Sequence, residues 1–405
     1  MTSPVTDQPR STLLARISCA IAIFAALLGS TAPSPLYPHY LEMLGLGKMM
    51  GTAIFAIYAG GTLAALFLGG SLAQKTRDLR RLILPGLVIT ALGAVMFASA
   101  HSLGMLLAGR FLNGFGTGMI TGMASASLFS LTPAEKRGSA AVLATLAFTG
   151  GATVGPLLSS SAIAIDLAPT ISPFVVIVVL CLVAGAGLMA CHWPLKAPVE
   201  KTGTKPQPSR GQVNRPLFVL ACMGVGTAWM VGSVLMALGA DLGQSVYILP
   251  SAAIAGLIPA VFQLFAGIGQ AVWGRVSSEK AILFGMLGIA LAQGALLMGE
   301  PTGSGFLMLA LMPVSGFFYG AAFVGALGMA NLSAPPELRG LYISRFYVAG
   351  YIANAIPTVV VGYLSDTLGL ATAFVLFSVC LVAVAAATLG MLQYCRRRRS
   401  DMVLS

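Results

Sequence analysis

Charged side chains are scarce in this sequence of 405 residues. Asp, Glu, Lys and Arg together make up only 9% of the chain, whereas hydrophobic residues make up 57%. A soluble globular domain carries about 25% charged residues. With so few charges, and with a mean hydropathy of +0.90, a water-soluble protein of this size is excluded. Most of the surface must therefore be solvated by lipid.

Cysteine and histidine are also sparse, with six and three residues respectively. No two cysteines form a CxxC pair, so neither a disulfide framework nor a metal site is predicted. The histidines His39, His101 and His192 are widely separated, and no paired carboxylates lie within the apolar runs. We therefore expect no metal, no cofactor except a coupling proton, and no enzyme activity. A multi-span membrane enzyme is a remote alternative, as is a receptor without transport activity.

Long apolar runs make up most of the chain. A helix needs about 20 apolar residues to cross the hydrocarbon core of a bilayer, and the sequence contains twelve runs of this kind. They cover residues 13–32, 49–71, 82–100, 103–129, 139–162, 171–191, 216–238, 247–273, 281–299, 305–330, 341–363 and 370–392. Unpaired strands cannot face lipid, and the alternating pattern of a membrane barrel is absent. The sequence predicts an all-α integral membrane protein with twelve transmembrane helices.

The basic residues are distributed unevenly between the loops. The chain has 23 Lys and Arg and a net charge of +11. If both termini are cytoplasmic, almost all of these residues fall on the cytoplasmic side, as the positive-inside rule requires. Topology thus explains the charge, and nucleic-acid binding is not predicted. We expect a monomeric, multi-pass protein of a bacterial inner membrane that binds a small-molecule substrate and contacts lipid.

A polar stretch separates the first six runs from the last six. Residues 192–215 are rich in Pro, Lys, Thr and Gln, a composition that predicts a flexible cytoplasmic linker. This linker would join an N-terminal six-helix bundle, residues 1–191, to a C-terminal bundle with a basic tail, residues 216–405.

The two halves share sequence features at a constant offset of 202 residues. The segment 133–138 recurs as 335–340, Gly114 corresponds to Gly316, and Gly118 corresponds to Gly320. A constant offset near half the length indicates duplicated bundles. Parallel repeats of this kind place a substrate pathway between the halves, near the middle of the membrane. The sequence therefore predicts a secondary transporter that works by alternating access.

Arg110 is the residue most indicative of function. A charge inside a membrane helix is costly unless it faces protein or water. Asn113 and Thr117 follow at spacings that place all three side chains on one helix face. We predict that this polar stripe gates or couples transport; a purely structural arginine is the alternative. In the fifth run, Gly151, Gly155 and Pro156 predict close packing against a neighbouring helix and a bend.

Charged segments at the cytoplasmic ends are candidates for a gate. They lie in the loop between the second and third runs and in the two repeated loops near residues 135 and 337. The candidate gate residues are Gly70, Lys75, Arg77, Arg80, Arg81, Glu135, Arg137, Glu337 and Arg339. A simple topological anchor is the alternative function for the cations of the first loop.

Three of these segments resemble motifs of the major facilitator superfamily. Residues 70–81 resemble its loop signature G-x-L-a-D-R-x-G-R-R, with Gln74 at the aspartate position. Residues 110–116 are similar to R-x-x-x-G-x-G. Residues 151–160 are similar to G-x-x-x-G-P-x-x-G-G, with serines in place of the last two glycines. The last pattern is characteristic of proton-coupled exporters, so the resemblance implies two six-helix bundles and drug or metabolite antiport with protons.

The resemblance also implies that helices 1, 4, 7 and 10 line the substrate cavity. The candidate cavity residues on these and neighbouring helices are aromatic, amide or thioether side chains, which suit a neutral or lipophilic solute. They are Tyr37, Trp229, Met236, Gln263, Phe318, Tyr319, Tyr347 and Asn354. Helix packing is the alternative function for much of this set.

The acidic residues leave the coupling site open. None of the twelve Asp and Glu lies at the middle of a predicted span. Asp241, Glu42 and His39 could reach an outward cavity, although each is expected in a loop. We therefore predict proton-coupled export from the resemblance alone. An uptake symporter or a uniporter for a sugar or an organic acid is the alternative.

Overall fold

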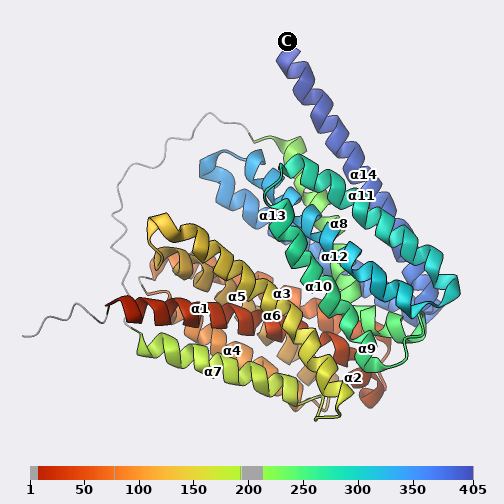
Figure 1. Cartoon of the computed structure of the whole chain (residues 1–405), viewed down its shortest axis with the longest axis horizontal. Helices are drawn as coiled ribbons and strands as arrows, with labels where there is room; N and C mark the ends of the chain where they lie inside the picture. Colours follow the sequence, from red (N-terminus) through yellow and green to blue (C-terminus); the bar gives the residue numbers. More distant parts are fainter. Residues whose placement is uncertain (1–7, 77, 192, 194–212, 405) are drawn as a thin grey trace, which may run out of the picture. The chain divides into compact units, whose positions relative to one another are not determined.

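The computed structural model describes residues 8–76, 78–191, 193 and 213–404, and every regular element in them is a helix (Figure 1). The chain divides into two compact units. The first comprises Met1–Gly45 and Ile57–Lys201, and the second comprises Leu46–Ala56 and Thr202–Ser405. The predicted linker, residues 192–215, lies largely outside the described residues.

The first unit is a bundle built around one central helix. Helix α1 packs against α5, α6 and α7, and α4 packs against α5 and α7. Its elements are α1 (Gln8–Thr31), η1 (Ser34–Leu36), α2 (Tyr37–Leu44), α3 (Lys48–Lys75) from residue 57 onward, α4 (Arg80–Ala98), α5 (Leu103–Ser130), η2 (Ala134–Lys136), α6 (Arg137–Ala164) and α7 (Ser172–Ala190).

The second unit repeats this packing pattern. Helix α8 packs against α12, α13 and α14, and α11 packs against α12 and α14. Its elements, besides the start of α3, are α8 (Arg215–Ser245), α9 (Ala252–Ala255), α10 (Leu257–Trp273), α11 (Ser278–Gly299), η3 (Glu300–Thr302), α12 (Gly305–Ser333), α13 (Pro336–Leu368) and α14 (Leu370–Leu404). Figure 1 shows α14 continuing past its neighbours towards the C-terminus.

Glycines at the 202-residue offset perform the same task in each unit. A Cβ atom on Gly114 would lie 2.2 Å from the carbonyl oxygen of Tyr58, and one on Gly316 would lie 2.2 Å from that of Phe262. These glycines allow the backbones of α5 and α3, and of α12 and α10, to approach closely, as small residues do in membrane helices. The repeat seen in the sequence is therefore a repeat of helix contacts.

The predicted all-α membrane fold with twelve long helices is confirmed. Within the described residues, eleven helical segments are long and apolar enough to cross a membrane. Helix α5 is the long helix outside that set, because the polar residues Arg110, Asn113 and Thr117 and several glycines lower its hydropathy. Its Arg110 side chain is nevertheless only 1% exposed.

Helices extend beyond the apolar runs, and this changes the environment of two charged segments. Helix α8 is capped by the side chain of Asn214 and ends at Ser245, so Asp241, expected in a loop, lies inside it. Helix α13 starts at Pro336 and includes Glu337 and Arg339 in its first turns, where a loop is expected. Hydrophobicity marks the part of a helix that faces lipid, whereas the helix itself continues wherever its backbone bonds are satisfied.

The start of α3 belongs to the second unit, in which residues 46–56 join residues 202–405. The reason is local contact: the first backbone amides of α3 and its Lys48 side chain bond to residues of α13 and α8.

Candidate functional site

Arg110 lies in the interior of the first unit. Its Nη1 donates a hydrogen bond of 2.6 Å to the carbonyl oxygen of Ser30 in the last turn of α1. Carbonyls at a helix C-terminus carry partial negative charge, which favours a cation there. The guanidinium carbon also lies 4.6 Å from the ring centroid of Tyr58 on α3, a distance that allows cation–π attraction. Arg110 thus connects α5 to two other helices of its unit.

The predicted polar stripe on α5 is present and buried. Asn113 and Thr117 are each 3% exposed, and the Thr117 hydroxyl donates to the carbonyl of Ala26 on α1, at 3.2 Å. Gly29 on α1 makes room for the Asn113 amide, because a Cβ there would lie 2.7 Å from its nitrogen. The stripe therefore lies along α1, and the side chains of Arg110 and Thr117 donate hydrogen bonds to the α1 backbone.

Tyr37 is the first residue of the short helix α2 and is 1% exposed. The Tyr37 hydroxyl lies near enough to Arg110 for an electrostatic interaction with its charge. Within the described residues, neither its hydroxyl nor Oδ1 of Asn113 has a hydrogen-bond partner. Buried polar atoms normally find partners, so these two atoms are available to hydrogen-bond with a water molecule or a polar group of a substrate.

The glycines of α6 hold that helix against α1. A Cβ on Gly151 would lie 2.3 Å from the carbonyl oxygen of Phe24, and one on Gly155 would lie 2.3 Å from the Thr31 hydroxyl. Ser159, which stands in place of a signature glycine, donates to the carbonyl of Ala32 at 2.7 Å. Together with the buried Pro156, these residues form a face that packs tightly against α1. Helix α1 therefore contacts both α6 and the Arg110 side chain of α5.

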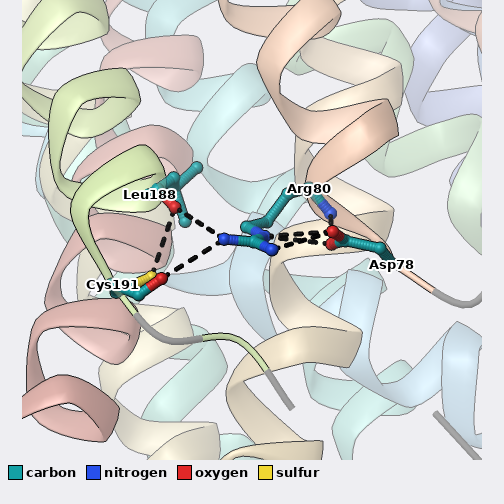
Figure 2. Close-up of polar contacts among 4 residues, drawn as sticks. All are labelled: Asp78, Arg80, Leu188 and Cys191. Atoms are coloured by element: carbon teal, nitrogen blue, oxygen red, sulfur yellow. Dashed lines mark hydrogen bonds and ion pairs between the residues drawn. The ribbon is translucent and has the colours of Figure 1, made fainter. Parts of the chain in front are cut away.

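Asp78 and Arg80 form an ion pair at the start of α4 (Figure 2). The guanidinium accepts no hydrogen bonds and donates in two directions. Towards Asp78, its Nη2 lies 2.9 Å from Oδ2. On the other side, Nη1 lies 3.3 Å from the carbonyl oxygens of both Leu188 and Cys191, at the end of α7. The Trp193 ring lies 5.5 Å away. Arg80 therefore bonds the start of α4 to the end of α7.

The protonation of Asp78 follows from this geometry. Burial alone would raise the pKa of the carboxyl, but the hydrogen bonds and charge of Arg80 outweigh it and hold the pKa below its usual value. A depressed carboxyl pKa stabilises the fold above the ordinary Asp range, and the contribution is lost as the pH falls through the depressed value. The pair is therefore intact at neutral pH.

We predict that replacing Asp78 with asparagine lowers the apparent Tm of the detergent-purified protein near pH 7 by a few degrees. The ion pair is partly exposed, and a pair of this kind stabilises a fold by about 1 kcal/mol or less. The difference from wild type should shrink as the pH falls from 7 through the depressed pKa of Asp78, because the native carboxyl then becomes protonated as well. Thermal unfolding across that pH range measures this. A Tm difference that is independent of pH would contradict the assigned ion pair.

Among the other gate candidates, Arg81 lies near enough for its charge to help lower the pKa of Asp78. The side chains of Arg81, Glu135, Arg137, Glu337 and Arg339 are exposed. Gly70 and Lys75 lie in the last turns of α3, and Arg77 lies outside the described residues. The sequence missed the contribution of Asp78, Cys191 and Trp193, because their proximity to Arg80 depends on how α4 and α7 pack.

In the second unit, aromatic rings gather around Trp229. The Trp229 ring centroid on α8 lies 4.8 Å from that of Tyr351 and 6.2 Å from that of Tyr347, both on α13. Phe323 of α12 stacks at 6.2 Å. All four side chains are partly exposed. The cluster offers polarisable ring faces, which suit an apolar or aromatic ligand.

The remaining cavity candidates have other neighbours. Tyr319 packs beside Gly232 and contacts the Phe262 ring at 5.1 Å. Phe318 packs against Gly288 of α11. The others differ in burial: Met236 is buried, whereas Gln263 and Asn354 are partly exposed.

Lys48 and Asp241 form an ion pair near the C-terminal end of α8, and the sequence did not predict this pairing. Asp241 is only 6% exposed, and its Oδ1 lies 2.5 Å from Nζ of Lys48. The only sequence clue was Asp241 itself, three residues beyond the predicted end of its helix.

Comparison with known proteins agrees with this arrangement. Residues 19–358 match the family model of the Major Facilitator Superfamily. Over 142 residues the chain is 28% identical to the Acurin A biosynthesis cluster MFS-type transporter of Aspergillus aculeatus (strain ATCC 16872 / CBS 172.66 / WB 5094). That match covers 35% of this chain and 25% of the fungal protein, so it spans a quarter of the length of this curated relative.

Solved structures share the fold over nearly the whole chain. A bacterial homolog of the human lysosomal transporter Spinster, inward-facing and unoccupied, has a TM-score of 0.78 at 15% identity and covers 97% of this chain and 98% of its own. A POT family transporter in complex with 5-aminolevulinic acid has a TM-score of 0.73 at 15% identity, covering 95% and 96%. At these identities the likeness shows a common fold and nothing about the substrate.

Proposed function

Because the chain belongs to the Major Facilitator Superfamily, and is thus a multi-pass membrane secondary transporter rather than an enzyme, we propose that it exports drugs or small neutral or lipophilic metabolites in exchange for protons. The two units would alternate in exposing the substrate site to either side. The basic loops support cytoplasmic termini, and we place the protein in a bacterial inner membrane as a monomer.

The buried Arg110 carries this proposal. An ionisable residue within a membrane helix is retained at a cost of several kcal/mol and marks a transport pathway or a relay. Here it contacts α1 through Ser30 and α3 through Tyr58, so a change at any of the three helices reaches the others. The unpartnered polar atoms of Tyr37 and Asn113 lie in the same region and are positioned to bind a polar group during transport.

The face between α6 and α1 supports export. Gly151 and Gly155 bring α6 against the backbone of α1, the helix that also binds Arg110. A displacement of α6 would therefore move Ser30 and the arginine together. Through this direct packing, the part of α6 that follows Arg137, which carries no charge, would contribute to coupling.

The aromatic cluster around Trp229 supports a neutral or lipophilic substrate. Its rings offer dispersion and stacking contacts, and the hydroxyls of Tyr347 and Tyr351 offer hydrogen bonds. Helices α8 and α12 contain a single charged residue between them apart from the terminal Arg215, namely Asp241. A charged organic acid would lack the paired cations that such ligands require.

We predict that cells expressing the protein accumulate several-fold less of an exported probe than control cells. An efflux-deficient bacterial host and a probe panel that includes the neutral compound chloramphenicol and the lipophilic cation ethidium provide the test. A protonophore should abolish the difference, because it removes the driving force. Higher accumulation in expressing cells would contradict export and favour an uptake symporter or uniporter.

A further inference from the structure

Helix α14 is longer than a membrane crossing requires. A crossing takes about 20 residues, whereas α14 runs from Leu370 to Leu404 and has 35 residues. Its apolar part, residues 370–392, is about 34 Å long at about 1.5 Å per residue, enough for a hydrocarbon core of about 30 Å. Figure 1 shows the helix continuing past its neighbours at this end. The residues after Leu392 therefore lie at and beyond the membrane surface.

Four consecutive arginines follow shortly after the apolar part. Residues 396–399 lie about 6–10 Å past Leu392 along the helix axis. The headgroup layer of a bilayer extends about 5–8 Å beyond the hydrocarbon core on each side, so the arginines begin at the depth of the lipid phosphates. The one acidic residue among residues 393–404 is Asp401. The end of the helix is therefore strongly basic.

Burial along α14 shows which side of the helix faces outward. Leu381, Ala385 and Leu392 are buried, on the side that packs against α8, α11 and α13. Exposed residues recur at intervals of three and four positions, the spacing of one helix face. They are Leu376, Cys380, Ala383, Ala387, Gly390 and Tyr394. Because this stripe is uncovered along the apolar part of the helix, it faces lipid.

An ion pair fixes the rotation of the arginine segment about the helix axis. Arg396 bonds to Glu279 in the first turn of α11, so Arg396 points towards that helix. Arg398 follows two residues later, about 200° further around a helix of about 3.6 residues per turn. It therefore points away from α11, with Tyr394 one turn before it on the same face. Tyr394 is 52% exposed, and tyrosine is enriched at the depth of lipid headgroups.

The chemistry of this surface matches an anionic phospholipid. Arg397 and Arg398 are both exposed, and a guanidinium group binds a phosphate through two parallel hydrogen bonds. Clusters of about four or more cations directly beyond a membrane helix attract acidic lipids. A zwitterionic headgroup brings its own ammonium group, which the arginines repel. The surface therefore favours headgroups with a net negative charge.

We propose that Arg397 and Arg398, together with Tyr394, form a binding site for the headgroup of an anionic phospholipid on the lipid-facing side of α14. The lipid phosphate accepts hydrogen bonds from the guanidinium groups, and the Tyr394 ring packs beside the glycerol backbone of the lipid. Arg396 stays bonded to α11, so the end of α14 is held between protein on one side and lipid on the other. The site is independent of the transported substrate and of the direction of transport.

Quenching by brominated lipids tests the site in the full-length transporter. The variant Tyr394→Trp is reconstituted into phosphatidylcholine bilayers, in which part of the lipid is dibrominated phosphatidylglycerol or, separately, dibrominated phosphatidylcholine. Fluorescence of the three native tryptophans is subtracted with the parent protein. We expect an affinity at residue 394 that is about tenfold higher for phosphatidylglycerol than for phosphatidylcholine. Equal quenching by the two lipids would overturn the proposal.

Three double variants in the Tyr394→Trp background show whether the arginines form the site. Arg397→Gln with Arg398→Gln should lose the preference for phosphatidylglycerol, whereas lysine at both positions should keep most of it, because the charges remain. Arg215→Gln with Arg275→Gln removes two exposed cations from other parts of the same unit and should keep the preference. A preference retained without the two α14 arginines, or lost equally in the Arg215 and Arg275 control, contradicts the assigned site.

Soluble phosphate distinguishes a lipid headgroup from a dissolved anion. Inorganic phosphate in excess over the protein is added to the Tyr394→Trp bilayers, with sodium chloride at equal ionic strength as the control for screening. The preference for phosphatidylglycerol should be the same in both solutions. If phosphate removes the preference and chloride does not, the site binds a dissolved anion, and the assignment to lipid fails.

Discussion

Replacing Arg110 with alanine is expected to reduce export of any identified probe by about 100-fold, the ratio that corresponds to roughly 3 kcal/mol. The substitution removes the bond to the Ser30 carbonyl and the contact with the Tyr58 ring, which together connect α5 to α1 and α3. Flux in cells or vesicles, normalised to the amount of transporter in the membrane, is the measurement.

Two substitutions separate the role of Arg110 in transport from a role in folding. Arg110→Lys keeps the positive charge but lacks the planar guanidinium that can lie over Tyr58 while bonding Ser30, so partial activity is expected. Thr117→Val removes a hydroxyl bond to α1 and should have a smaller effect. If Arg110→Ala is present in the membrane at normal levels and transports at the wild-type rate, the polar stripe has no role in transport.

Alanine at either member of the glycine pair Gly114 and Gly316 is expected to destabilise its own unit. In both cases the new Cβ would lie 2.2 Å from a backbone carbonyl oxygen of the neighbouring helix, which cannot rotate aside as a side chain can. The helices must separate, at a cost of about 1–3 kcal/mol or more. The apparent Tm in detergent should fall by several degrees for each variant, and expression should decrease.

Matched controls lie on the same helix and in the same unit. A Cβ on Gly122 of α5, or on Gly294 of α11, would meet nothing within 4 Å. Alanine at these positions should leave stability unchanged or raise it slightly, because alanine favours a helix over glycine by up to about 1 kcal/mol. Equal effects of Gly114→Ala and Gly122→Ala would show that helix propensity, and not close backbone packing, determines the result.

The sequence predicted the helices well because lipid imposes a simple rule. Every backbone group inside the membrane must be satisfied within the segment, so an apolar run of sufficient length is a helix. The constant offset between Gly114 and Gly316 predicted a duplication, and it also marks corresponding helix contacts. In the structure both glycines lie at the same kind of helix contact, so the repeat preserved the positions where two backbones touch.

Helix ends and charged contacts were harder to predict. Hydropathy ended the seventh helix near residue 238, yet Asp241 lies inside α8 because its charge is balanced by Lys48 from a distant part of the chain. The partners of Arg80 could not be predicted either, because the carbonyls of Leu188 and Cys191 come within hydrogen-bond distance only when α4 and α7 pack together. A single sequence shows which residues are charged, but not which of them meet.

The most direct test of proton-coupled export is the response of an imposed pH gradient to substrate. Inverted membrane vesicles, acidified inside and monitored with a pH-sensitive acridine dye, receive a probe that the cells have been shown to export. We predict that the probe partly dissipates the gradient in wild-type vesicles and leaves it unchanged in vesicles with the Arg110→Ala variant. An exported probe that does not perturb the gradient in wild-type vesicles would contradict proton exchange.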